Sequence, residues 1–182
     1  MTILRRGFVV LAILWVILLP VATFAASRPS SVSSDVGHAL AFVVYRIGSV
    51  VCHQRPERSL HLFAVQMPVC ARCTGVYVGA AVMAIGVAFR RSRGPVKKRG
   101  TAGAVGIPRG PGRVDRWYVA PWLGSARRVL LVSVLPGAAT LVYEWSTGQM
   151  PAHWVRATSG VPLGAAVAWI VCRAAPARRE GM

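Results

Sequence analysis

Four long apolar runs constrain this chain more than any other feature of its sequence. They cover residues 7–26, 73–89, 129–145 and 154–172. Each run is close to the roughly 20 residues that an α-helix needs to cross about 30 Å of hydrocarbon. Pro136 and Pro162 lie inside the last two runs, and a bilayer helix tolerates proline when neighbouring helices bond the freed carbonyls. The sequence therefore predicts an all-α integral membrane protein, with four transmembrane helices in a single domain over residues 1–182.

The first run has an alternative interpretation as a cleaved signal peptide. Arg5 and Arg6 precede it, and residues 21–26 resemble a cleavage region. The run is longer than the 7–15 apolar residues typical of a signal peptide, however. We interpret it as a membrane helix, and the sequence leaves open whether residues 1–26 are removed.

The distribution of charge predicts the orientation of these helices. Between residues 90 and 128 the sequence carries eleven Arg and Lys side chains and a single acid, Asp115. Such an excess of basic residues between two spans is typical of a cytoplasmic loop. Four crossings then place both termini inside, and residues 52–73 outside. We expect a multi-pass protein of the cell (plasma or inner) membrane.

Two further segments complete the expected organisation. Residues 92–112 are rich in Gly, Pro and Arg and lack aromatic side chains on which bases would stack. We therefore expect the basic loop to contact anionic lipid head groups rather than nucleic acid. Residues 36–51 are apolar but short, and they carry His38 and Arg46. This pattern favours a helix lying in the outer interface.

Two apolar stretches resemble one another and predict a helix contact. Residues 75–82 read GVYVGAAV, and residues 160–167 read GVPLGAAV. Either the chain contains a parallel repeat, or small residues recur here because membrane helices favour them. In both cases small residues four apart allow two helices to approach closely, which predicts packing of the second and fourth spans. The residues concerned are Gly75, Gly79, Gly160 and Gly164. A small homo-oligomer of the bundle is a further expectation.

The outer segment concentrates residues that bind metals or carry redox chemistry. Cys52 and His53 precede a Cys70-x-x-Cys73 pair, and three thiolates with one imidazole form the ligand set of a closed zinc site, structural or sensory in role. His61 is an alternative fourth ligand. A second hypothesis is a thiol–disulfide oxidoreductase that uses Cys70 and Cys73 and transfers electrons to a quinone, since a helix N-terminus lowers a thiol pKa.

A third hypothesis is a disulfide from Cys52 to Cys70 or Cys73 that fastens the outer loop of an interaction, lipid-binding or transport-accessory protein. The sequence does not decide whether the protein is an enzyme. Glu144 is the only acid within a predicted span, and we expect Arg156 or Arg72 to pair with it. Arginines gathered there also suit an anionic lipid head group or solute. The expected polar cluster comprises Gln54, Arg55, Arg58, Arg72, Tyr77, Glu144 and Arg156.

The outer motif resembles that of a known family. Residues 52–59 read CHQRPERS, and residues 70–79 read CARCTGVYVG. This stretch resembles the predicted prokaryotic membrane proteins grouped as domain of unknown function 2085 (DUF2085). Residues 156–160, RATSG, resemble the family's Arg-x-x-Thr-Gly, with Ser159 in place of Thr. The resemblance implies a membrane location and includes His53 but not His61, and it implies no particular reaction.

Overall fold

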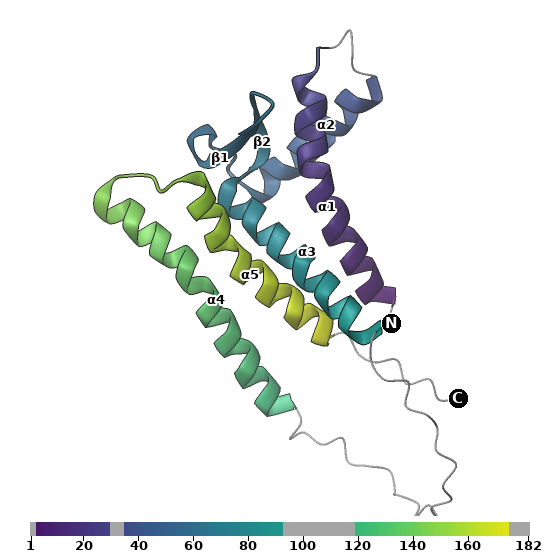
Figure 1. Ribbon diagram of the computed structural model, residues 1–182, viewed down its shortest axis with the longest axis vertical. Coiled ribbons are helices and arrows are strands. Elements are labelled where there is room, and N and C mark those ends of the chain that lie inside the picture. Colours follow the sequence, from purple (N-terminus) through teal and green to yellow (C-terminus); the bar gives the residue numbers. More distant parts are fainter. Residues whose placement is uncertain (1–2, 30–34, 93–118, 175–182) are drawn as a thin grey trace, which may run out of the picture.

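The chain forms five α-helices, one short 3₁₀ helix and a two-stranded hairpin within the residues described by the computed structural model, which are 3–29, 35–92 and 119–174. Figure 1 shows their arrangement, with the hairpin at one end of the helices. In chain order the elements are α1 (Ile3–Ser27), α2 (Asp35–Val51), η1 (Pro56–Arg58), β1 (Ser59–Leu62), β2 (Val65–Cys70), α3 (Ala71–Ser92), α4 (Val119–Thr147) and α5 (His153–Ala174).

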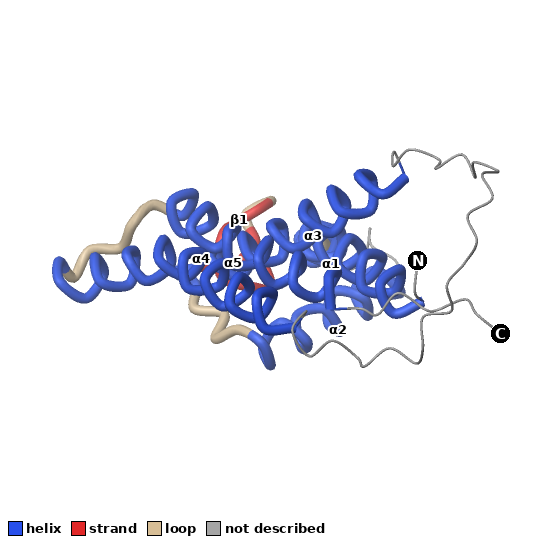
Figure 2. The backbone as a smooth tube through the Cα atoms, turned by 90° about the horizontal axis from the view of Figure 1, so that it is seen from below, coloured by secondary structure: helices blue, strands red, loops and turns tan. Residues whose placement is uncertain are grey.

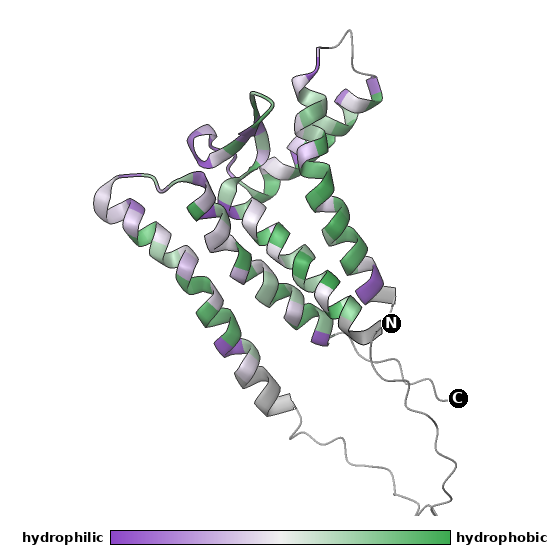
Figure 3. Cartoon of the chain, in the orientation of Figure 1, coloured by the Kyte–Doolittle hydropathy of each residue, from purple (hydrophilic) through white to green (hydrophobic). Residues whose placement is uncertain are grey.

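Four of the helices are long and apolar enough to cross a membrane. The apolar stretches are Arg5–Ser27 in α1, Ala71–Phe89 in α3, Ser125–Thr147 in α4 and His153–Ala174 in α5. Figure 3 shows apolar residues along these helices, whereas hydrophilic residues gather at the hairpin and near the helix ends. Because the outward faces of these helices carry exposed Leu, Val and Phe side chains, they suit lipid rather than water.

The helices are longer than the apolar runs from which they were predicted. α3 continues to Ser92 and α4 begins at Val119, so both ends of the predicted basic loop over residues 90–128 are helical. Arg and Lys are good helix formers, so a helix does not stop where its apolar face stops. Residues 93–118, the rest of that loop, lie outside the described residues. α2, predicted as an interfacial helix over residues 36–51, covers Asp35–Val51 and is not among the four candidate spans.

The expectation of an all-α chain is wrong at residues 59–70, which form an antiparallel hairpin of β1 and β2. Val65, Met67 and Val69 occupy alternate positions of β2, and Pro68 between the last two is buried as well, so the middle of this strand is packed on both faces. The turn consists of Phe63 and Ala64, with φ angles of 54° and 61°. Two central residues with positive φ match the right-handed twist of a tight hairpin. Neither is Gly or Asn, so the usual turn signal is absent from the sequence.

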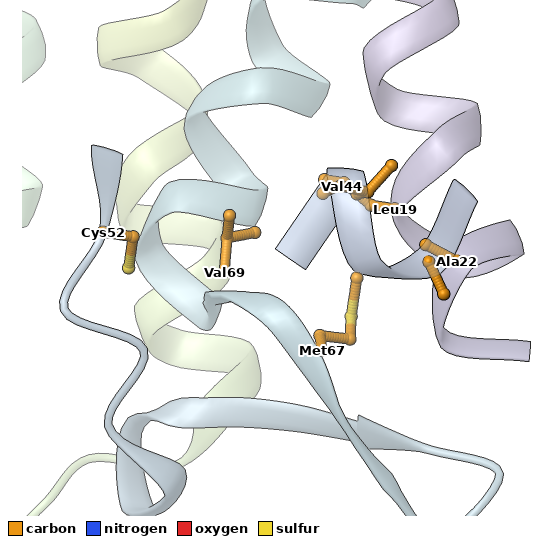
Figure 4. Close-up of a cluster of buried hydrophobic side chains, with 7 residues drawn as sticks. Leu19, Ala22, Val44, Cys52, Met67 and Val69 are labelled. Carbon is orange, nitrogen blue, oxygen red and sulfur yellow. The ribbon is translucent and has the colours of Figure 1, made fainter. Parts of the chain in front are cut away.

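A small apolar cluster fixes the hairpin against the first two helices. Leu19 and Ala22 come from α1, Val44 from α2, and Met67 and Val69 from β2, and all are almost fully buried. Figure 4 shows Met67 between β2 and the helix that carries Val44. This cluster holds β2 in place at the start of α3, where the cysteines lie.

Among the described elements the most extensive packing is between α3 and α5, which lie side by side and run in the same direction (Figures 1 and 2). A methyl group added at Gly75 would collide with the carbonyl oxygen of Ala157, and one added at Gly164 with that of Val76. Gly79 and Gly160 meet the carbonyls of Val161 and Arg72 in the same way. The contacts are reciprocal between the two similar stretches, because each helix presents its glycines to the other's backbone.

We expect Gly164→Ala to separate α3 from α5 and lower the stability of the folded protein. The new methyl group meets backbone atoms, which cannot rotate away. The free energy of unfolding should therefore fall by about 1–3 kcal/mol or more, as in an overpacked core. The measurement is thermal unfolding of the purified protein in detergent.

Gly86→Ala is the matched control, because it adds the same methyl group to α3 where nothing lies within 4 Å. Its unfolding temperature should stay close to that of the parent chain. Equal unfolding temperatures for Gly164→Ala and the parent would contradict the close approach of the two helices.

Candidate functional site: a thiol cluster beside an arginine-lined cavity

Three cysteine sulfurs meet at the end of the helices that carries the hairpin. The Sγ atoms of Cys52, Cys70 and Cys73 all lie within 4.8 Å of one another. Cys52 follows the last residue of α2, Cys70 ends β2, and Cys73 lies in the first turn of α3. None of these cysteines is bonded to another. We call this group the thiol cluster.

Gln54 and Gly48 hold Cys52 close to β2. The Nε2 atom of Gln54 donates hydrogen bonds to the carbonyl oxygens of Tyr45 (3.0 Å) and Pro68 (2.6 Å), which joins the loop after α2 to β2. Gln54 adopts a left-handed backbone conformation, with φ 46°. A side chain at Gly48 would collide with the Pro68 carbonyl. The absence of a Cβ at Gly48 therefore allows α2 to approach β2 closely enough for Cys52 to reach Cys70.

Two further hydrogen bonds fasten the same region. The Gln66 side-chain amide donates to the carbonyl of Gln54 at 2.5 Å, and the Tyr45 hydroxyl donates to the carbonyl of Gln66. Burial raises the pKa of the Tyr45 hydroxyl, which keeps it protonated as a donor. Gln66 and Tyr45 were not among the predicted site residues, because nothing in the sequence relates them to Cys52.

Polar hydrogens surround the cluster on the strand side. The backbone N–H of Cys70 donates to the Sγ of Cys52 at 3.3 Å. A hydrogen bond from the Cys73 thiol is the largest cause that lowers the pKa of Cys70, to about 5. The backbone N–H groups of Cys73 and Arg72, at the start of α3, also donate to Cys70 and favour a negative charge on its sulfur. The cluster therefore favours at least one thiolate at neutral pH.

The structure does not include the predicted fourth ligand in this group. His53 is adjacent to Cys52 in sequence and exposed, and it lines the same cavity as the sulfurs, but it is not among the ligand atoms within 4.8 Å. Cys52 still bonds to the last turn of α2 through its backbone N–H and the Gly48 carbonyl (2.9 Å), whereas His53 is the next residue of the loop and does not converge on the sulfurs. His61, the alternative, is exposed on β1 and is also outside the group.

A buried carboxylate with three guanidinium groups lies beside the thiol cluster. Glu144 on α4 accepts hydrogen bonds from Nε (2.8 Å) and Nη2 (2.6 Å) of Arg156 on α5. Arg72 on α3 reaches the same oxygen at 3.3 Å, and Arg58 on η1 pairs with the other oxygen at 3.7 Å. The sequence predicted Arg156 or Arg72 as the partner. The structure brings both to Glu144 together with Arg58, because α3 and α5 lie so close.

Thr140 also belongs to this group, although the sequence analysis did not identify it. Its hydroxyl accepts a hydrogen bond from Arg72 at 2.9 Å. Thr140 lies one helical turn before Glu144, on the same face of α4, and this i to i+4 spacing was the available signal. Tyr77, in contrast, lies apart from the polar cluster, because its ring meets that of Trp15 on α1 edge-on at 5.9 Å.

A cavity of about 380 Å³ connects the thiol cluster and the arginines. Its polar lining combines three cysteines, four arginines, a histidine and a glutamine, from the loop after α2, η1, β2, α3 and α5. These residues are Cys52, His53, Gln54, Arg55, Arg58, Cys70, Arg72, Cys73 and Arg156. Residues distant in sequence thus form one site, in which soft sulfur ligands lie next to a concentration of positive charge.

Comparison with known proteins relates this site to a family. Residues 52–170 match the family described as "Predicted membrane protein (DUF2085)". The match covers well over half of the chain, and it begins at Cys52 and includes the hairpin, α3 and α4. The chain belongs to this family. Within DUF2085 the matched segment therefore contains every polar residue that lines the cavity.

Two archaeal relatives match shorter segments. Uncharacterized protein MJ1492 of Methanocaldococcus jannaschii is 44% identical over 50 residues, which cover 28% of this chain and 32% of that protein. An uncharacterized protein of Methanothermobacter thermautotrophicus is 50% identical over 30 residues, covering 16% of this chain and 27% of its own length. The chain thus spans about a third or less of each relative. No solved structure matches the chain.

We expect Glu144→Gln to destabilise the protein by about 3–5 kcal/mol, as expected for removal of one partner of a buried ion pair. Arg156 has a side chain only 3% exposed, so it would lose its counter-charge without gaining water. The measurement is chemical or thermal unfolding in detergent.

Glu57→Gln is the matched control, because it makes the same change on the exposed helix η1. The described residues give Glu57 no ion pair. A Glu144→Gln protein as stable as the Glu57→Gln protein would show that the three arginines do not depend on this carboxylate.

Proposed function

We propose that this membrane protein holds a zinc-like metal ion on the thiolates of Cys52, Cys70 and Cys73, in a sensory or structural role. The supporting observation is the convergence within 4.8 Å of three sulfurs, from the loop after α2, from β2 and from α3. Zinc binds thiolate sulfur at about 2.3 Å in a tetrahedral arrangement, which requires sulfurs about 3.8 Å apart. A small inward movement of the three side chains suffices to reach that spacing.

The chemistry of the surroundings supports thiolate ligation. The N–H of Cys70 already donates to the Sγ of Cys52, and hydrogen bonds of this kind from outside the ligand set stabilise and orient metal-bound groups. Three protein ligands leave one tetrahedral position. Since the sulfurs line the cavity and His53 lies outside their group, we infer that a fourth ligand would be water or a small molecule from the cavity. An exchangeable position favours sensing over a purely structural role, because structural sites are usually closed.

We further propose that the thiol cluster faces the outside of the plasma membrane. The connection between α3 and α4 carries an excess of basic residues, which favours its retention in the cytoplasm. The hairpin and the thiol cluster lie at the other end of α3 (Figure 1). The outer side is oxidising in many organisms, and a bound metal would protect the thiols from forming a disulfide.

A second candidate function is thiol–disulfide exchange by Cys70 and Cys73. The low pKa of Cys70, about 5 because of the hydrogen bond from Cys73, favours it, since the thiolate is the reactive form. Oxidation of the two thiols to a disulfide would transfer two electrons and two protons to a quinone or to a partner disulfide. Cys52 would then be a neighbour of the pair rather than a ligand.

We expect purified protein to contain about one equivalent of zinc or a similar metal, and Cys70→Ser and Cys52→Ser to lose it, because each removes one of three thiolates. His53→Ala should retain the metal, since the imidazole is not part of the converging group. The measurement is elemental analysis with a thiol assay.

Cys172→Ser is the matched control, because Cys172 is buried near the other end of α5 and takes no part in the thiol cluster. It should retain the metal. Protein without metal that carries a Cys70–Cys73 disulfide would favour the redox candidate, and free thiols without metal would contradict both proposals.

For the orientation, we expect a membrane-impermeant maleimide to modify Phe63→Cys in intact cells. Phe63 is exposed in the hairpin turn, and Ala174 is exposed at the opposite end of the helices. Ala174→Cys should react only after the membrane is opened. Labelling of the unsubstituted chain gives the background from its four native cysteines. The reverse pattern would place the thiol cluster in the cytoplasm.

A further inference from the structure

The arginines around the cavity carry more positive charge than the described residues balance. Four guanidinium groups line it, those of Arg55, Arg58, Arg72 and Arg156. The only carboxylate paired with any of them within the described part of the chain is Glu144. Three positive charges remain, and a zinc ion with three thiolates would offset only one of them.

Several donors of these guanidinium groups are also unused. The Nε atoms of Arg58 and Arg72 and the Nη1 atom of Arg156 are buried and have no hydrogen-bond partner among the described residues. A buried polar group without a partner costs about 1–3 kcal/mol, and a charged group costs more. Such donors are therefore expected to have a partner in the working protein. The positive charge around them makes an anion a better partner than water alone.

The donors are arranged from the mouth of the cavity to its floor. Side-chain exposure falls from 38% at Arg58 to 27% at Arg72 and 3% at Arg156. Arg55 is exposed and has no ion pair among the residues described. A ligand that enters past Arg55 and Arg58 thus loses water gradually and meets the deepest guanidinium last. Electrostatic attraction strengthens in that direction, because the effective dielectric constant falls with burial.

The arginines that line the cavity come from three separate elements, Arg58 from η1, Arg72 from α3 and Arg156 from α5. A planar carboxylate matches a single guanidinium fork, whereas a tetrahedral oxyanion presents oxygens in several directions at once. Two uncompensated positive charges beside a metal-occupied thiol cluster also correspond to the charge of a phosphate monoester.

We propose that this cavity binds a phosphate group through Arg55, Arg58, Arg72 and Arg156. The phosphate comes either from a soluble phosphate or from the head group of an anionic lipid. Arg72, Glu144 and Arg156 each lie within one helical turn of the end of a candidate span, which is the depth of lipid head groups in a bilayer. The phosphate site does not require the metal, since it uses different side chains.

The test is isothermal titration of the full-length protein with inorganic phosphate, in a maltoside detergent that contains no phosphate and at constant ionic strength with chloride. We expect saturable binding of one phosphate per chain. Arg58→Gln should weaken it by at least about tenfold, the effect of losing a hydrogen bond to a charged group. The phosphate affinity of Arg58→Lys should lie between those of the parent and Arg58→Gln, because lysine retains the charge but lacks the forked donors of the guanidinium group.

Arg46→Gln is the matched control, because it removes one positive charge from an exposed position on α2 that does not line the cavity. It should bind phosphate as the parent does. If Arg46→Gln and Arg58→Gln weakened phosphate binding equally, the effect would come from overall charge alone, and the proposal would be overturned. If Arg58→Gln fails to fold, the unfolding temperature of the parent protein is measured with phosphate and with chloride instead. Phosphate should raise it and chloride should not.

A second arm separates the two sources of phosphate. Nanodiscs that contain phosphatidic acid, whose head group is a phosphate monoester, are compared with nanodiscs of phosphatidylcholine alone to test whether the lipid occupies the site and excludes inorganic phosphate. Competition that disappears in Arg58→Gln indicates a lipid head group, and phosphate binding that the lipid does not affect indicates a soluble ligand. The absence of saturable binding in both arms would overturn the proposal. Repeating the titration with Cys70→Ser separates it from the metal, because phosphate binding should persist there.

Discussion

Two helices in lipid gain little from burying apolar surface against one another, so they associate only where their backbones pack closely. In this protein that constraint falls on α3 and α5, where four glycines face the carbonyl groups of the opposite helix. The close approach brings Arg72 and Arg156 near enough to share Glu144 from α4. The buried charge cluster therefore depends on the helix contact, because the contact between α3 and α5 brings the two arginines together.

The thiol cluster depends on a second close approach, of α2 to β2 at Gly48 and Pro68. Gln54 bridges the same two elements and fixes the loop that carries Cys52. Cys70 and Cys73 then lie across the junction of β2 and α3. The cavity lies between this junction and the charge cluster, so a ligand there would contact thiols and guanidinium groups together. Metal binding and anion binding would thus occur in adjacent positions of one site without sharing ligands.

Some of this arrangement was predictable, and the reasons are local. Hydropathy indicated four candidate membrane helices, because the length of a span and its apolar composition are properties of consecutive residues. The hairpin was missed because β2 is short and its turn, Phe63 and Ala64, lacks the usual Gly or Asn. The grouping of His53 with the cysteines followed from their order in the chain, whereas the structure does not bring its imidazole among the three sulfurs.

The sequence by itself determined the solvent, the family and the types of residue that carry the chemistry, because hydropathy, charge and motif spacing are read along the chain. The tertiary structure alone decided that three sulfurs from separate elements converge, and that Glu144 takes three arginines instead of one. It also decided that four arginines line the same cavity as the thiols. These outcomes depend on which backbones approach one another across long sequence separations. That approach is set by packing between whole helices and not by the preference of any single residue.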